Sequence, residues 1–307
     1  MQSNFRPRGI YSALWIPTDA GGALDRARLS ALIGFQRQRG IHGILALGST
    51  GEFPHFSLEQ RLALLEAVAE IAAPLPVMAN ITDIRPRAAI ELGRRARELG
   101  LPAVALMPPF FFPASQADML AYFVHVAEAV QLPVMLYNFP ELTGKRIDLP
   151  TIAAFAERAP MCAIKQSGAE FAYHEPLIAL GREKGFVVMS GADTRLPEVF
   201  GLGASGCIGG MVNMVPELMV GIYRGCVEGS GGATDTAAAR MREVGAVLDQ
   251  LTFPLNVAAG IEARGLAPGV PKAVVSAESQ ALYGRIVTEL RDRFGSWGLV
   301  PAAAAVN

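Results

Sequence analysis

Short apolar runs of strand length recur along the 307-residue chain and constrain its fold more than any other feature. They lie about 30 residues apart, the length of one βα unit. The runs are Ser12–Ile16, Gly43–Leu47, Pro76–Ala79, Ala103–Met107, Pro133–Tyr137, Cys162–Lys165, Phe186–Ser190 and Gly206–Ile208. Segments with helical periodicity, such as Leu58–Ala72 and Ser115–Val130, separate them. Continuous apolar strands alternating with amphipathic helices predict a parallel sheet covered by helices, and eight strands favour closure into a (β/α)8 TIM barrel.

The alternation stops at about residue 216. Four helices without further strands are predicted there, at Pro216–Cys226, Asp235–Leu251, Asn256–Glu262 and Glu278–Phe294. Because an eight-unit barrel needs only one helix after its last strand, we expect a C-terminal helical appendage. The predicted organisation is a single domain, with a barrel core at residues 8–215, C-terminal helices at 216–295 and a tail at 296–307.

Composition excludes several classes of partner. The formal net charge of −1 gives no electrostatic reason to expect nucleic acid or an anionic membrane. The apolar runs are shorter than the roughly 20 residues of a membrane-spanning helix, and the N-terminus has no secretory signal pattern. The three cysteines have no metal-type spacing, which is typical of reduced thiols. The four histidines are scattered along the chain and predict no metal cluster. We therefore expect a cytoplasmic protein that needs no metal and no organic cofactor.

Lys165 is the lysine with the most unusual surroundings. It ends the apolar run that starts at Met161, and catalytic groups of such barrels lie at the C-terminal ends of strands. Apolar surroundings disfavour the ammonium form and leave a neutral amine that can attack a carbonyl. The alternative is a strand-end lysine whose ammonium extends to solvent. The other three lysines, Lys145, Lys184 and Lys272, are expected to be solvated surface charges.

Tyr137 ends the strand that precedes the one carrying Lys165. Neighbouring strands lie about 4.8 Å apart, so the phenol and the amine would face the same substrate if the two strand ends are level. The phenol could then carry a proton. The alternative is a packed tyrosine with a hydrogen-bonded hydroxyl.

The segment Gly48-Ser49-Thr50-Gly51-Glu52 follows the second strand. Its glycines permit close backbone approach, and its hydroxyl and N–H groups could hold a carboxylate. A turn that caps a helix is the alternative. Glycine-rich turns also follow the last two strands, at Ser190-Gly191-Ala192-Asp193 and Gly206-Cys207-Ile208-Gly209-Gly210.

Four motifs in order resemble the dihydrodipicolinate synthase/N-acetylneuraminate lyase family. They are Gly48-Ser49-Thr50-Gly51-Glu52, Tyr137-Asn138-Phe139-Pro140 with Thr143-Gly144, Ile164-Lys165-Gln166, and Ser190-Gly191-Ala192-Asp193, and the match extends over about residues 8–295. The resemblance implies a class I lyase that forms an imine with pyruvate or a related 2-keto acid, assembled as a homotetramer or a dimer.

The resemblance also implies roles for individual residues. Lys165 would form the Schiff base, Tyr137 would act as acid and base, and Ser49 and Thr50 would bind the keto-acid carboxylate. Ile208 would place a backbone carbonyl near the imine. The candidate catalytic residues are thus Lys165, Tyr137 and Thr50, and the candidate substrate-binding residues are Ser49, Thr50, Gly51, Ile208, Phe111, Leu142 and Asp193.

Three departures from the family pattern bear on the substrate. Phe111 replaces a tyrosine that relays protons in the synthases, and Leu142 replaces an arginine that binds the second carboxylate of their substrate. Both argue against dihydrodipicolinate synthesis. Thr194 stands where the sialic-acid lyases have glutamate. These departures favour an aldolase or dehydratase of 2-keto-3-deoxy sugar acids, while Phe110-Phe111-Phe112 also allows an apolar or aromatic aldehyde product.

Three other hypotheses remain open at this stage. The first is the synthase itself, condensing pyruvate with aspartate semialdehyde. The second is a phosphate- or flavin-binding barrel, suggested by the glycine-rich turns after the last two strands. The third is a keto-acid-binding barrel that has lost its chemistry, suggested by Phe111.

Overall fold

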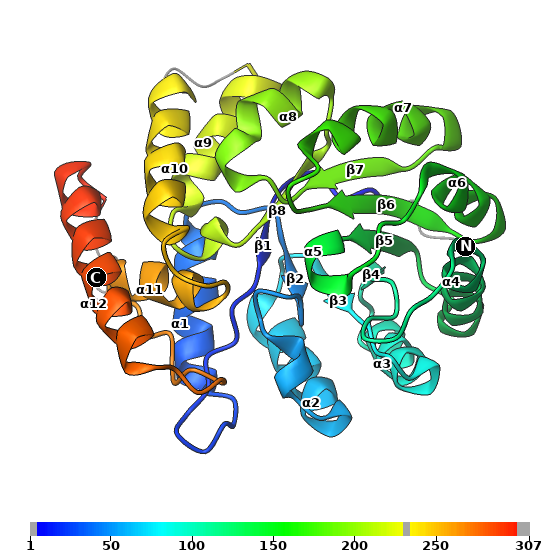
Figure 1. Ribbon diagram of the computed structural model, residues 1–307, viewed down its shortest axis with the longest axis horizontal. Coiled ribbons are helices and arrows are strands. Elements are labelled where there is room, and N and C mark those ends of the chain that lie inside the picture. The colour runs from blue at the N-terminus through cyan, green and yellow to red at the C-terminus, as the bar shows by residue number, and fades with distance from the viewer. Residues whose placement is uncertain (1–4, 230–233, 300–307) are drawn as a thin grey trace.

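Eight parallel strands close into a barrel in chain order (Figure 1). The structure, a computed structural model, describes residues 5–229 and 234–299. The strands are β1 (Gly9–Ala13), β2 (Gly43–Ala46), β3 (Val77–Asn80), β4 (Ala103–Leu106), β5 (Val134–Asn138), β6 (Met161–Gln166), β7 (Val187–Ser190) and β8 (Gly206–Gly209). Nearly every strand residue is buried, as expected when side chains fill the barrel on one face and helices cover the other. The predicted (β/α)8 fold is confirmed.

Helices follow each strand and form the outer ring. They are α1 (Arg26–Gln38), α2 (Leu58–Ala72), α3 (Pro86–Glu98), α4 (Gln116–Val130), the short α5 (Pro140–Thr143), α6 (Leu149–Arg158), α7 (His174–Lys184), α8 (Leu196–Leu202) and α9 (Pro216–Val227). Ser57 begins α2 with a capping box, in which its hydroxyl accepts from the Gln60 amide and the Gln60 side chain accepts from the Ser57 amide. No helix of the described residues is long and apolar enough to cross a membrane.

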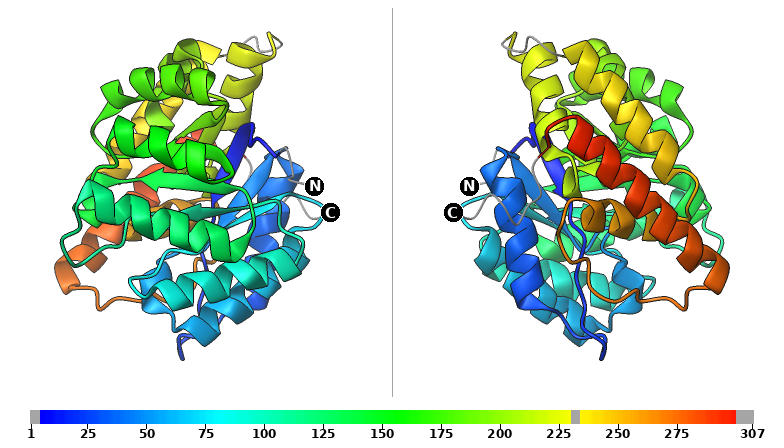
Figure 2. Two further views of the ribbon diagram at one scale, coloured as in Figure 1. Left: turned by 90° about the vertical axis from the view of Figure 1, so that its right-hand side faces the viewer. Right: turned by 90° about the vertical axis from the view of Figure 1, so that its left-hand side faces the viewer.

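Three further helices follow the ring. They are α10 (Thr234–Leu248), α11 (Leu255–Ala263) and α12 (Ala277–Ser296), and Figure 1 shows them together on one side of the barrel. α12 packs along α10 and α11 on the outside of the molecule (Figure 2). Of the predicted tail, residues 300–307 lie outside the described part of the chain.

The first strand lies three residues earlier than predicted. The apolar run Ser12–Ile16 suggested a strand there, whereas β1 ends at Ala13. Trp15 and Ile16 are buried as a loop, because the Trp15 amide donates to Asn213 Oδ1 and its indole Nε1 donates to Pro268 O. A segment about 250 residues away therefore covers this part of the run, and local periodicity cannot reveal that.

Candidate active site

Lys165 and Tyr137 form the centre of the candidate site. They are register partners at the ends of β6 and β5, and Lys165 Nζ donates a hydrogen bond to Tyr137 Oη at 2.8 Å. Both are almost completely buried, with exposures of 4% and 2%. The next register pair is also bonded, because Asn138 Nδ2 donates to Gln166 Oε1 at 2.7 Å. Two successive register pairs therefore hold the amine and the phenol together, as the sequence predicted.

Residues 48–52, hereafter the 48–52 loop, reach this pair from the end of β2. Ser49 Oγ lies 3.5 Å from Tyr137 Oη, and Thr50 lines the same cavity as Lys165. Gly51 lines neither of the two cavities described below. A Cβ atom there would lie 2.8 Å from Leu14 O, so Gly51 allows the loop to pack against the backbone after β1.

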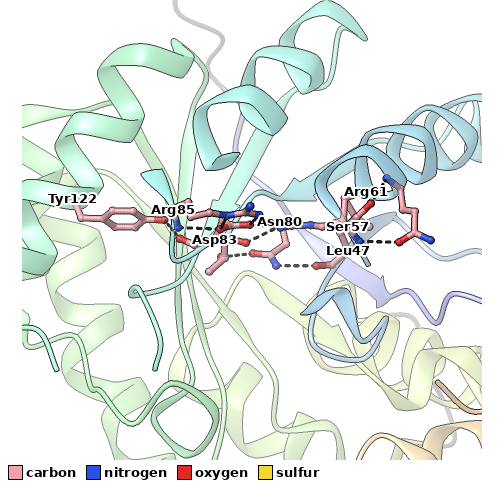
Figure 3. A network of polar contacts seen from close by, with 9 residues as sticks. Leu47, Ser57, Arg61, Asn80, Asp83, Arg85 and Tyr122 are labelled. Atoms are coloured by element: carbon pink, nitrogen blue, oxygen red, sulfur yellow. Dashed lines mark hydrogen bonds and ion pairs between the residues drawn. The ribbon is translucent and has the colours of Figure 1, made fainter. Parts of the chain in front are cut away.

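Buried polar contacts support the start of the 48–52 loop from neighbouring elements. Leu47 has a left-handed backbone with φ of 57°, and Asn80 Nδ2 donates to its carbonyl at 2.8 Å (Figure 3). Beyond Asn80, Arg61 of α2 donates to Asp83 Oδ2 at 3.0 Å, and Tyr122 Oη donates to Asp83 O at 3.0 Å (Figure 3). Sequence analysis missed Asn80, although a polar residue directly after an apolar strand run was a usable signal.

A cavity of about 440 Å³ opens at Lys165. The predicted residues that line it are Tyr137, Thr50, Ile208 and Asp193. Polar residues that the sequence did not suggest as site residues also line it, among them Ser167, Arg195, Asp249 and Asn256. Asn256 Nδ2 donates to Leu248 O, while its buried Oδ1 accepts no hydrogen bond from the described residues. Asn256 therefore lines the cavity as a residue, while its Oδ1 is closed off from solvent.

Asp193 connects the turn after β7 to the turn after β8. Its Oδ2 accepts from the Met211 amide at 2.8 Å, and its Oδ1 lies 3.5 Å from Cys207 Sγ. The residue as a whole is only partly buried, but its carboxyl group lies against Gly209. Burial of the carboxyl group raises the pKa of Asp193 above its ordinary value. The nearby Lys165 opposes that rise only in part.

A smaller, mostly apolar cavity of about 240 Å³ adjoins the site on the other side of Ser49. Leu142 of α5 lines it, as do Phe110, Met107 and Phe253. Phe111, which the sequence placed beside the site, lines neither cavity and is 81% exposed. Its left-handed φ of 77° turns this side chain outward, and Phe110 faces the cavity instead.

Lys272 does not match its prediction. The side chain is only 5% exposed and pairs with Glu52 Oε2 of the 48–52 loop. The expectation of a solvated surface charge was wrong, because the pairing partner lies 220 residues away in sequence. Lys184 pairs with Glu157 and Glu183 and is more exposed, at 25%.

Among residues 5–229 and 234–299, no group of three or more His, Cys, Asp or Glu side chains could hold a metal ion.

A family model and individual relatives in the comparison with known proteins indicate the same family. The sequence model of the dihydrodipicolinate synthetase family matches residues 6–290. A 4-hydroxy-tetrahydrodipicolinate synthase of Methanosphaerula palustris is 29% identical over 91% of this chain and 98% of its own length. One from Pseudomonas putida is 31% identical over 72% of this chain and 76% of its own length.

A solved structure agrees with these sequence matches. YagE, a prophage protein of the dihydrodipicolinic acid synthase family from E. coli K12, was solved in complex with pyruvate. It superposes with a TM-score of 0.86 at 26% identity, covering 95% of this chain and 99% of YagE. The chain therefore belongs to the dihydrodipicolinate synthetase family and is a lyase of the class I, pyruvate-dependent type found in it.

Proposed function

We propose that this chain is an aldolase or dehydratase of a 2-keto-3-deoxy sugar acid, with Lys165 as the imine-forming residue. The observation that carries the proposal is the buried 2.8 Å contact between Lys165 Nζ and Tyr137 Oη. An amine held against a phenol at the end of two paired strands can attack a carbonyl while the phenol supplies or removes the proton.

The chemistry follows from this pair. Lys165 Nζ adds to the C2 carbonyl, and loss of water gives a protonated imine, which accepts the electron pair of a bond that breaks at C3. In aldol cleavage, Tyr137 accepts the proton of the C4 hydroxyl while the C3–C4 bond breaks, which releases an aldehyde and leaves an enamine. Protonation of the enamine at C3 and hydrolysis of the imine then give pyruvate and free Lys165. In dehydration, Tyr137 accepts the C3 proton to give an enamine, and the C4 hydroxyl takes up a proton and departs as water, which forms a C3–C4 double bond. Hydrolysis of the imine then frees Lys165.

The 48–52 loop is proposed to bind the keto-acid carboxylate through Ser49 and Thr50. Ser49 Oγ lies 3.5 Å from Tyr137 Oη, and this supports a second role for Ser49 as a proton relay. It would replace the relay tyrosine of the synthases, whose position is occupied here by Phe111. Ile208 lines the cavity beside Lys165, in keeping with a backbone carbonyl near the imine.

The proposed substrate class rests on the polar wall of the larger cavity. Ser167, Asn256 and Asp193 line it, and polar side chains of this kind suit the hydroxyl groups of a substrate. Leu142 lies in the apolar cavity, where it offers no charge to a second carboxylate. A hydroxylated chain suits the polar wall, and Arg195, which also lines the larger cavity, is a cation that can bind a hydroxyl or carboxylate group on such a chain.

Two alternatives retain specific support. Relatives named as 4-hydroxy-tetrahydrodipicolinate synthases support condensation of pyruvate with aspartate semialdehyde. The apolar cavity lined by Phe110, Met107 and Leu142 supports an apolar or aromatic aldehyde. A barrel that only binds keto acids has less support, because Lys165 and Tyr137 keep a reactive geometry.

The test is a comparison of kcat/KM values in one preparation. A panel of 2-keto-3-deoxy sugar acids is assayed for pyruvate release and for water loss, and pyruvate is assayed for condensation with aspartate semialdehyde. The proposal predicts turnover of at least one sugar acid and little condensation. Condensation faster by tenfold, about 1.4 kcal/mol of transition-state preference, would establish the synthase alternative instead.

Assembly and location stay predictions. A homotetramer or dimer is supported by the exposed neighbouring rings of Phe111 and Phe112, because adjoining apolar side chains on a surface favour contact with a partner. A cytoplasmic location rests on the sequence pattern alone.

A further inference from the structure

Lys272 is a buried lysine that the proposed chemistry does not use. It follows α11 in the connection to α12, and its Nζ donates to Glu52 Oε2 at 2.6 Å. The two side chains are 5% and 10% exposed. The ammonium also lies 4.2 Å from the centre of the Trp15 ring. Removing a lysine from water is unfavourable unless a partner compensates, so Glu52 is the group that fixes its position.

The backbone that carries Lys272 is anchored to the segment after β1. Trp15 Nε1 donates to Pro268 O at 2.7 Å, Thr18 Oγ1 donates to Val270 O at 3.0 Å, and the Val270 amide donates to Thr18 O at 2.9 Å. Residues 268–272 therefore form a support that is attached to the barrel independently of Glu52.

Glu52, the last residue of the 48–52 loop, has an unfavourable backbone. Its φ of 56° is left-handed, as is the φ of 57° at Leu47 immediately before the loop. Non-glycine residues keep this conformation only where surrounding contacts impose it. Asn80 bonds to Leu47 on one side, and Lys272 bonds to Glu52 on the other. The loop is thus fixed at both ends by side chains from distant elements.

We infer that Lys272 is a positioning residue for substrate binding, acting through Glu52 on the hydroxyl groups of Ser49 and Thr50. It lines neither cavity, so its expected effect on the substrate is indirect. The connection between α11 and α12 thereby becomes part of the keto-acid site. This inference rests on the proposed function, which assigns the substrate carboxylate to the 48–52 loop.

The test measures imine trapping by borohydride at Lys165 as a function of ketone concentration. Lys272→Met keeps the length of the side chain and removes its charge. We expect the half-saturating pyruvate concentration to rise by about tenfold or more, the loss typical of a charge-assisted hydrogen bond, with the saturating rate within about threefold of wild type. Pyruvamide, which has the ketone without the carboxylate, should be trapped equally by both proteins.

The controls separate positioning from folding. Lys184→Met removes the partly exposed lysine that pairs with Glu157, and it should leave trapping unchanged. Thermal unfolding tests whether Lys272→Met is folded. If it is not, Glu52→Gln takes its place, because this variant loses the charge but keeps an acceptor for Lys272. Its half-saturating concentration should rise less, and only for pyruvate.

An unchanged half-saturating concentration in a folded variant would overturn the inference, and so would equal losses for pyruvate and pyruvamide. Wild-type protein that is not trapped at Lys165 would overturn the proposed function, and the inference with it. Wild-type trapping with an unaffected variant overturns the inference alone.

Discussion

Replacing Tyr137 by phenylalanine removes one oxygen atom from the centre of the site. The ring remains, so its stacking against Phe139, with centroids 6.2 Å apart, is kept. The lost hydroxyl is buried and contacts Lys165 Nζ at 2.8 Å and Ser49 Oγ at 3.5 Å. A hydrogen bond of this kind contributes about 0.5–1.5 kcal/mol to stability, or somewhat more with a charged partner, so the variant should fold.

The expected effect on catalysis is larger than the effect on stability. Loss of a positioned acid–base group costs about 10²–10⁴ in rate, which corresponds to about 2.7–5.4 kcal/mol of transition-state free energy. We therefore expect Tyr137→Phe to lose most of its turnover of a 2-keto-3-deoxy sugar acid. It should still form the borohydride-trapped adduct with pyruvate at Lys165, because the amine is intact.

The assay follows pyruvate release under steady-state conditions and adduct mass in parallel, with unfolding monitored by circular dichroism. Turnover near the wild-type value in a folded variant would refute the reasoning. Proton transfer would then belong to another group, with the hydroxyl of Ser49 acting through water as the next candidate.

Three further predictions test other parts of the account. Asp83→Ala leaves the guanidinium of Arg61, which is 3% exposed, without its carboxylate, and should lower the free energy of unfolding by about 3–5 kcal/mol. Glu66→Ala removes one partner of an exposed pair and should cost about 1 kcal/mol or less. Equal losses in denaturant titrations would contradict this prediction. Burial lowers the pKa of His174 below its usual 6.5, so the unfolded chain binds more protons and stability should fall as pH drops below 6.5. His174→Gln should flatten that decline in unfolding curves, and an unchanged slope would exclude His174 as its source. Leu142→Arg should raise kcat/KM for condensation with aspartate semialdehyde by about tenfold, and no increase would show that the second carboxylate does not bind there.

The barrel could be predicted because its signal is local and repeated. Each strand is a short apolar run and each helix has its own periodicity, as at α2, whose predicted bounds agree with the structure. The exception is instructive. Trp15 contacts residues 268–272 and is buried with Ile16 outside the sheet, and these two apolar residues extended the predicted first strand beyond its real end.

The pair at the centre of the site was also predictable. Lys165 and Tyr137 end adjacent strands, and parallel register alone brings such residues together. Lys272 and Asn256 could not be found in this way, since they come from the C-terminal helical region and meet the barrel only after folding. Phe111 shows a third limit, because a single left-handed backbone angle decided that it faces outward.

The most direct test of the central claim is to map the site of borohydride trapping with pyruvate by peptide mass spectrometry. Lys272 makes this test demanding, because it is a second buried lysine and burial lowers the pKa of its ammonium below the usual value. The account predicts one reduced pyruvate adduct per chain, on Lys165, and none in Lys165→Ala. An adduct on Lys272, Lys145 or Lys184, or trapping that persists in Lys165→Ala, would contradict it.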